Sequence, residues 1–162
     1  MTLTHPSPHH NARPAGATIR VIVLHADAGA SDAGTLSWLA APESKVSYHT
    51  LIGRLGGVYT IVAPDRRAWH AGKGAWGGST DVNSISLGLS FANRHDGTEA
   101  LTPVQRAVAA SVVRMWTMAY PSIEAVVTHA MVAPTRKTDP EHAPGFDLAE
   151  YVAAFTAARA TP

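Results

Sequence analysis

The chain has 162 residues and no cysteine, so it is long enough to bury a core of its own, and neither disulfides nor thiolate metal ligands are available. Lys and Arg total 13 against 12 for Asp and Glu, which leaves a formal net charge of +1. The longest basic clusters are the pairs Arg66-Arg67 and Arg136-Lys137, and this pattern excludes the electrostatic footprint of a nucleic-acid-binding protein.

The first segment, residues 1–17, contains three prolines and three histidines and is expected to form a flexible tail. It lacks the charged start and apolar centre of a signal peptide, and no apolar run in the chain reaches membrane length. We therefore expect a protein made in the cytoplasm, without a membrane partner. The remaining residues, 18–160, are expected to form one domain.

Strands and helices alternate after this tail. Residues 18–25 are rich in β-branched side chains and predict a buried strand. Ser31 or Asp32 can cap a short helix that ends before Pro42. Residues 48–52 and 58–62 predict a hairpin around Gly56-Gly57.

The second half of the chain adds a buried strand at 124–129 and two helices. Thr102, Pro103 and Gln105 form a capping-box signature for a long helix. Its expected buried face consists of Val104, Val108, Val112, Met115 and Ala119. A last helix over 148–158 is expected to pack through Tyr151 and Phe155. The pattern predicts an α/β domain with a central mixed sheet flanked by helices.

Two histidines stand where buried strands end, and an aspartate follows on a proline-containing loop. His25 ends the first strand, His129 ends the strand at 124–129, and Asp139 lies ten residues after His129. Two imidazoles and one carboxylate are a ligand set that zinc accepts in open catalytic sites. A lone histidine at a strand end is more often a hydrogen-bonded core residue, so each position alone would be weak evidence.

The order of several motifs resembles the zinc-dependent N-acetylmuramoyl-L-alanine amidases, a superfamily shared by phage lysozyme-type amidases, wall-recycling amidases and animal peptidoglycan recognition proteins. The segments that carry the resemblance are 21–25, 47–52, 68–72, 83–91, 102–105 and 129–139. They cover nearly the whole chain after the tail. The resemblance implies the amidase fold and a zinc site formed by His25, His129 and Asp139.

The resemblance also implies roles around the metal. Lys137 would stabilise the negative oxygen of a tetrahedral intermediate, and Tyr48 would orient water or the substrate carbonyl. His70 would wall the cleft and bind substrate or support a ligand. Trp76, between glycines, is either a stacking platform for substrate or a loop anchor.

Ser90 departs from the recycling amidases, which resemble this strand but carry a glutamate there. Peptidoglycan recognition proteins resemble the chain more closely in having a small residue at this position. We include Ser90 among the expected substrate contacts, and leave the general base open between Tyr48, Asp139 and the metal's own water.

The sequence thus predicts a monomeric zinc enzyme that cleaves the amide between N-acetylmuramic acid and L-alanine of peptidoglycan or a muropeptide. Its first expected context is a phage or prophage endolysin. A cytosolic wall-recycling amidase and a non-catalytic muropeptide-binding module are the alternatives.

Overall fold

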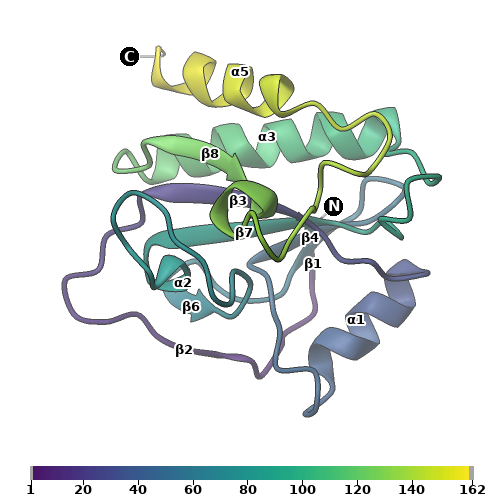
Figure 1. Ribbon diagram of the computed structural model, residues 1–162, viewed down its shortest axis with the longest axis horizontal. Helices are drawn as coiled ribbons and strands as arrows, with labels where there is room; N and C mark the ends of the chain where they lie inside the picture. The colour runs from purple at the N-terminus through teal and green to yellow at the C-terminus, as the bar shows by residue number, and fades with distance from the viewer. Residues whose placement is uncertain (1, 161–162) are drawn as a thin grey trace.

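Six strands form one mixed sheet in the order β1-β5-β4-β7-β3-β8 in the computed structural model, which describes residues 2–160 (Figure 1). The sheet strands are β1 (Thr2–Thr4), β3 (Val21–Ala26), β4 (Thr50–Ile52), β5 (Val58–Thr60), β7 (Ser86–Phe91) and β8 (Ala125–Thr128). β4 and β5 form the predicted antiparallel hairpin, and the other neighbouring pairs run parallel. β2 (His10–Ala12) and β6 (Arg66–Ala68) pair separately as an antiparallel ribbon.

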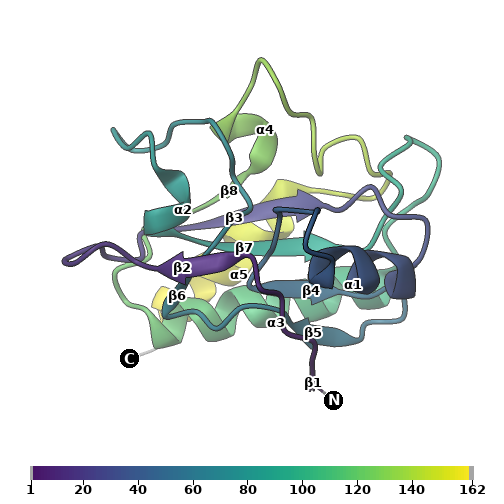
Figure 2. The ribbon, with the colours of Figure 1, turned by 90° about the horizontal axis from the view of Figure 1, so that it is seen from below.

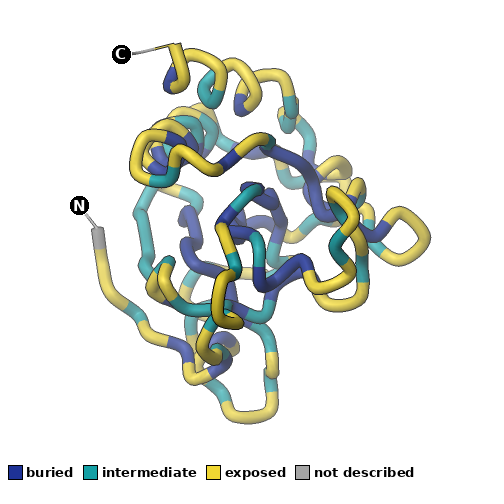
Figure 3. The backbone as a smooth tube through the Cα atoms, turned by 90° about the vertical axis from the view of Figure 1, so that its left-hand side faces the viewer, coloured by how far each residue is buried: buried dark blue, intermediate teal, exposed yellow. Residues whose placement is uncertain are grey.

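Alternation along the central strands gives the sheet two different faces. In β3, Ile22 and Leu24 pack into the main core, whereas Val21 and Val23 join a cluster on the other face. His25 continues the second series by its spacing of two residues. Every residue of β3 and β7 is buried, and Figure 3 shows that buried segments lie in the interior of the molecule while exposed segments surround them. The strands are buried on both faces, which is why they read as continuous apolar runs.

Two long helices, α3 (Pro103–Ala119) and α5 (Leu148–Arg159), lie side by side over one face of the sheet (Figure 1). The predicted capping box of α3 is present: Thr102 Oγ1 accepts from the Gln105 amide, and the Gln105 side chain accepts from the Thr102 amide. In α5, Tyr151 is fully buried and Phe155 packs against the core, as expected.

The predicted buried face of α3 is right at Val112, which is buried, and at Val108, which packs against the core, but wrong at Val104, Met115 and Ala119. Val104 and Met115 are 45% and 56% exposed. The buried positions are Gln105, Ala109, Val112, Val113, Trp116 and Thr117. Two of them are polar, and both form hydrogen bonds inside the core. The side-chain amide of Gln105 donates to the Ala92 carbonyl, and the Thr117 hydroxyl donates to the Val113 carbonyl. Because polar residues occupy part of the buried face of α3, the spacing of apolar residues alone did not identify that face.

The short helices lie away from α3 and α5: α1 (Asp32–Ala40), α2 (Val82–Ile85) and α4 (His129–Val132) (Figures 1 and 2). Ser31 caps α1 as predicted, because its side chain accepts from the Gly34 amide. No helix within residues 2–160 is both long and apolar enough to cross a bilayer.

The expectation of a flexible tail over residues 1–17 is wrong for the residues that the structure describes. β1 extends the sheet beside β5, and the Ser7 hydroxyl donates to the Leu39 carbonyl. The Arg13 guanidinium donates to the carbonyl oxygens of Pro64, Asn83, Ser84 and Ser86. Long-range pairing holds this segment, so its own composition could not reveal the order.

Candidate metal centre

The three predicted ligands meet in the structure. His25 is the next-to-last residue of β3, and His129 begins α4 directly after β8. Asp139 lies on the loop that follows α4. The Nδ1 atoms of His25 and His129 lie 3.0 Å apart, and Asp139 Oδ2 lies 3.1 Å from His129 Nδ1 and 3.4 Å from His25 Nδ1. All three residues are buried, and no other such group of histidine, cysteine or carboxylate side chains occurs in the described part of the chain.

The hydrogen bond of His129 Nε2 determines which nitrogen of the ring carries the proton. His129 Nε2 lies 3.0 Å from the carbonyl oxygen of Ala71, and a carbonyl can only accept. The Nε2 atom is therefore the protonated one. In the neutral ring this leaves Nδ1 with a lone pair directed at Asp139 and His25.

A chain of hydrogen bonds fixes the tautomer of His25 in the same way. The Ser86 hydroxyl donates to the Val82 carbonyl at 2.6 Å, so its oxygen accepts from His70 Nε2 at 3.0 Å. His70 Nδ1 then accepts from His25 Nε2, also at 3.0 Å. Burial lowers the pKa of His25 to about 4 and that of His70 well below its ordinary value, so both rings are neutral near pH 7. His25 Nδ1 is left with a lone pair.

With both rings neutral, two nitrogen lone pairs and one carboxylate oxygen converge at one buried point, an arrangement that a cation bound there would stabilise. Zinc ligands about 2.1 Å from the metal at tetrahedral angles lie roughly 3.4 Å from one another. The observed separations of 3.0–3.4 Å are close to that spacing. The donor set and its outer hydrogen bonds therefore fit a zinc ion with three protein ligands.

Gly88 in β7 provides the space for this hydrogen-bond chain. A Cβ atom at this position would lie 2.6 Å from His70 Cγ, so no side chain fits there. On the same strand, the Gly88 amide donates to His49 Nδ1 at 2.9 Å. His49 is almost fully buried and does not line the metal cleft, as its alternation with Tyr48 predicted.

His49 predicts a pH-dependent stability. Burial lowers the pKa of His49 to about 3, whereas an unfolded histidine titrates near 6.5. Between these values the unfolded chain binds the proton and the folded chain does not, so stability is complete above pH 6.5 and falls as the pH drops toward 3. We expect His49 alone to reduce the free energy of unfolding by about 2 kcal/mol at pH 5.

Urea unfolding at pH 7.5, 6 and 5 measures this effect. Replacement His49→Gln should make the decrease shallower, whereas His10→Ala, in the half-exposed strand β2, should leave it unchanged. Equal stability of the wild type at pH 7.5 and pH 5 would contradict the prediction.

Two of the three ligands, His129 and Asp139, line a cleft of about 320 Å³. It is lined by Ala26, Asp27, Ala28, Val46, Tyr48, His70, His95, His129, Arg136, Lys137, Thr138 and Asp139. Lys137 lies beside Asp139 as the sequence predicted, and its ammonium group forms no hydrogen bond or salt bridge within residues 2–160. Arg136 is held in place, because its guanidinium donates to the carbonyl oxygens of Ala71 and Lys73.

Tyr48 reaches the metal centre from the segment just before β4, which begins at Thr50 rather than at the predicted residue 48. Its ring packs against that of His25, with 5.2 Å between the centroids. Burial raises the pKa of Tyr48, so the phenol keeps its proton and can donate but not act as a base near pH 7. Tyr48 thus belongs to the cleft, as expected.

Two of the expected substrate contacts are not placed for that role. Ser90 is fully buried next to Tyr48 and does not line the cleft. Trp76 lies by Arg20, which stacks its guanidinium 5.6 Å from the indole centroid. Arg20 precedes β3 and His25 is five residues further along, roughly 16 Å away at 3.3 Å per residue. The geometry therefore favours the alternative reading of Trp76 as a loop anchor.

His95 lines the cleft, although sequence reasoning did not select it. His95 lies on the loop after β7 with a left-handed φ of 52°. Its Nε2 atom lies 3.1 Å from the Thr138 hydroxyl, and its ring stacks on that of His142. The signal was weak, because the loop carries no strand or helix periodicity that would place His95 beside the ligands.

Comparison with known proteins agrees with this geometry. A family model described as N-acetylmuramoyl-L-alanine amidase matches residues 15–142. The chain is similar to the 1,6-anhydro-N-acetylmuramyl-L-alanine amidase AmpD of Escherichia coli (strain K12), at 35% identity over 90% of this chain and 87% of the relative.

Solved structures show the same similarity. A selenomethionine derivative of AmpD has a TM-score of 0.76 at 30% identity and covers 94% of this chain and 93% of its own, which confirms the predicted fold. The amidase AmiD of E. coli, in complex with anhydro-N-acetylmuramic acid-L-Ala-D-gamma-Glu-L-Lys, has a TM-score of 0.67 at 28% identity. That match covers 78% of this chain and 55% of AmiD.

Proposed function

The chain belongs to the N-acetylmuramoyl-L-alanine amidase family and is an amidase of this type, and we propose that it cleaves soluble 1,6-anhydromuropeptides as a cytosolic wall-recycling enzyme that depends on zinc. The similarity to a 1,6-anhydro-N-acetylmuramyl-L-alanine amidase over most of both chains carries the substrate part of this proposal. It favours the recycling alternative over the endolysin that the sequence first suggested.

The zinc part rests on the convergence of His25, His129 and Asp139. Zinc in such a site supplies an activated water molecule and polarises the carbonyl oxygen of the scissile amide. His70 and Ser86 hold the His25 ring in the tautomer that presents Nδ1, and the Ala71 carbonyl does the same for His129. Hydrogen bonds of this kind orient metal-binding rings and raise their affinity.

Two side chains of the cleft are suited to stabilise the reaction. Lys137 would place its unpaired ammonium group near the oxygen that becomes negative when water attacks the carbonyl. The protonated Tyr48 phenol would donate a hydrogen bond to the water or to the substrate. Because Tyr48 stays protonated, two of the three candidates for the general base remain, Asp139 and the metal's own water.

The binding-module alternative is less favoured by this geometry. A protein that only binds muropeptide has no need for three converging lone pairs or for a free cation beside them. Both features are present here.

The proposal is tested by comparing two substrates with the purified protein. We expect release of free stem peptide from a soluble 1,6-anhydromuramyl tripeptide, measured by mass spectrometry, at a rate roughly 10-fold or more above release from intact sacculi. A chelated sample serves as the control. Faster digestion of sacculi would favour the endolysin, and saturable binding without release would favour the binding module.

A further inference from the structure

Asn83, in the short helix α2, connects the surroundings of the two metal-binding histidines. Its side-chain oxygen accepts hydrogen bonds from two successive backbone amides, that of His70 at 3.1 Å and that of Ala71 at 2.8 Å. An amide oxygen has two lone pairs, so this one atom can take both donors. Asn83 is only 7% exposed, and the loss of bonds to a buried backbone amide is costly.

The two residues that Asn83 holds are the ones that contact the outer nitrogens of the histidines. His70 Nδ1 accepts from His25 Nε2 at 3.0 Å. The Ala71 carbonyl accepts from His129 Nε2, also at 3.0 Å. His25 and His129 are 104 positions apart in the chain, yet adjacent residues of one segment hold both rings. A shift of the backbone at 70–71 would therefore turn both rings together.

Ser86 holds the same segment in a more limited way. Its hydroxyl accepts from His70 Nε2 at 3.0 Å, so it fixes the His70 ring and, through that ring, His25. Asn83 instead fixes the backbone of His70 and of Ala71. The Ser86 bond thus acts on the His25 ring, whereas the Asn83 bonds act on both metal-binding rings.

Arg13 fixes the position of Asn83 itself. Its guanidinium donates to the carbonyl oxygen of Asn83 at 3.1 Å, to that of Ser84 at 2.9 Å and to that of Ser86 at 2.8 Å. Burial lowers the pKa of Arg13 to about 10, so the group is still charged near pH 7 and these bonds are charge-assisted. A helix of four residues such as α2 is not stable by its own hydrogen bonds, so this external contact holds Asn83 in place.

On the basis of the zinc part of the proposed function, we propose that Asn83 is a positioning residue of the metal centre. Through the backbone of residues 70 and 71, it sets the directions in which His25 and His129 present their Nδ1 lone pairs. Asn83 is not one of the three ligands and does not line the cleft, so it acts on the metal only through these histidines. Outer hydrogen bonds of this kind typically contribute 10- to 100-fold to metal affinity.

The zinc affinity of the purified protein, measured by competition with a chromophoric chelator, tests this role. Replacement Asn83→Ala removes the shared acceptor and should weaken zinc binding roughly 10- to 100-fold. Asn83→Asp keeps an oxygen at the same place, and the Arg13 guanidinium nearby offsets the added charge, so this variant should recover most of the affinity. Asn83→Ser, whose oxygen is too short to reach both amides, should bind zinc as weakly as Asn83→Ala and replaces it if the alanine variant does not fold.

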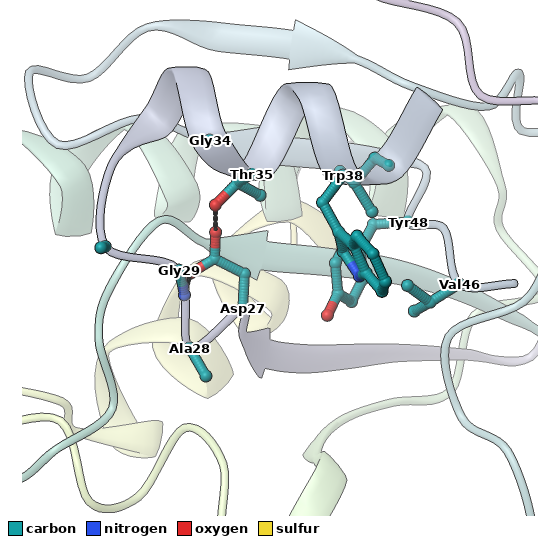
Figure 4. Close-up of a pocket in the computed structure, with 10 residues that line it drawn as sticks. Asp27, Ala28, Gly29, Gly34, Thr35, Trp38, Val46 and Tyr48 are labelled. Atoms are coloured by element: carbon teal, nitrogen blue, oxygen red, sulfur yellow. Dashed lines mark hydrogen bonds between the residues drawn. The ribbon is translucent and has the colours of Figure 1, made fainter. Parts of the chain in front are cut away.

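Thr35→Val is the matched control for the loss of a buried hydrogen bond near the site. Thr35 is 6% exposed, and its hydroxyl donates to the Asp27 carboxylate on the loop after β3 (Figure 4). This bond holds the chain that follows His25 but contacts neither imidazole. Thr35→Val and Asn83→Ala should both lower the free energy of unfolding of the metal-free protein. Zinc affinity should stay within about twofold of the wild type in Thr35→Val alone.

Circular dichroism of the metal-free variants shows that each is folded before zinc is added. Wild-type zinc affinity in a folded variant without the Asn83 oxygen, an equal loss in Thr35→Val, or no recovery in Asn83→Asp would each overturn the positioning role. Tight zinc binding that does not depend on Asn83 would overturn this role and leave the proposed function intact. A wild type with no measurable zinc affinity would overturn the zinc part of the proposed function and this role with it.

Discussion

Replacement His129→Ala is expected to lower kcat/KM by about a thousandfold or more and to remove the bound metal. The substitution deletes one of three converging ligand atoms and leaves two, too few to hold zinc tightly in an open site. A thousandfold loss corresponds to roughly 4 kcal/mol of transition-state stabilisation, which lies within the contribution expected of a catalytic metal. Release of stem peptide from an anhydromuropeptide and the zinc content by mass spectrometry measure the two effects.

The matched control for this change is His142→Ala. His142 is an exposed histidine on the loop beyond Asp139, stacked on His95 but outside the ligand set. This variant should keep its zinc and lose little activity. Circular dichroism of both variants separates loss of metal from loss of fold. Activity of His129→Ala near that of the wild type, or wild-type activity that survives complete chelation, would contradict the zinc site.

Replacement Lys137→Ala is expected to lower kcat about 100- to 1,000-fold with little change in zinc content, because single groups that stabilise a developing oxyanion contribute on this scale. Lys137 lines the cleft beside Asp139 and makes no salt bridge or hydrogen bond through its ammonium group within residues 2–160. Its charge is therefore free for a substrate. KM should change much less than kcat, since the interaction strengthens only in the transition state.

Lys73→Ala is the control for loss of one positive charge near the site. The Lys73 side chain is exposed and does not line the cleft. Only its backbone carbonyl contacts the site, because it accepts a hydrogen bond from Arg136. Its activity should stay close to that of the wild type. Loss of zinc from Lys137→Ala, or an unchanged kcat, would show that Lys137 does not have the assigned role.

The sequence predicted those elements whose formation depends on residues close together in the chain. The capping box at Thr102, the β-branched strand before His25 and the hairpin around Gly56-Gly57 are all confirmed. The metal ligands were found for a related reason: strand ends meet at one edge of a parallel sheet, so His25 and His129 were expected near each other.

The features that sequence reasoning missed depend on contacts between distant segments. The order of residues 2–17 comes from pairing with β5 and β6, and nothing within that segment indicates it. Trp76 was ambiguous because a tryptophan between glycines carries no information about which end of the sheet its loop covers. Part of the buried face of α3 was missed because Gln105 and Thr117 are polar, and buried hydrogen bonds make them suitable for the core.

The N-terminal segment has a consequence for where this domain begins. The match to the family model starts at residue 15, yet β1 (Thr2–Thr4) adds a strand to the sheet well before that point. Arg13 also binds carbonyl groups from the loop before β6 and from α2. The unit that folds therefore begins before the segment that the family model matches. A boundary drawn from that model alone would cut through the hydrogen-bonded structure and leave the edge of β5 without its neighbour.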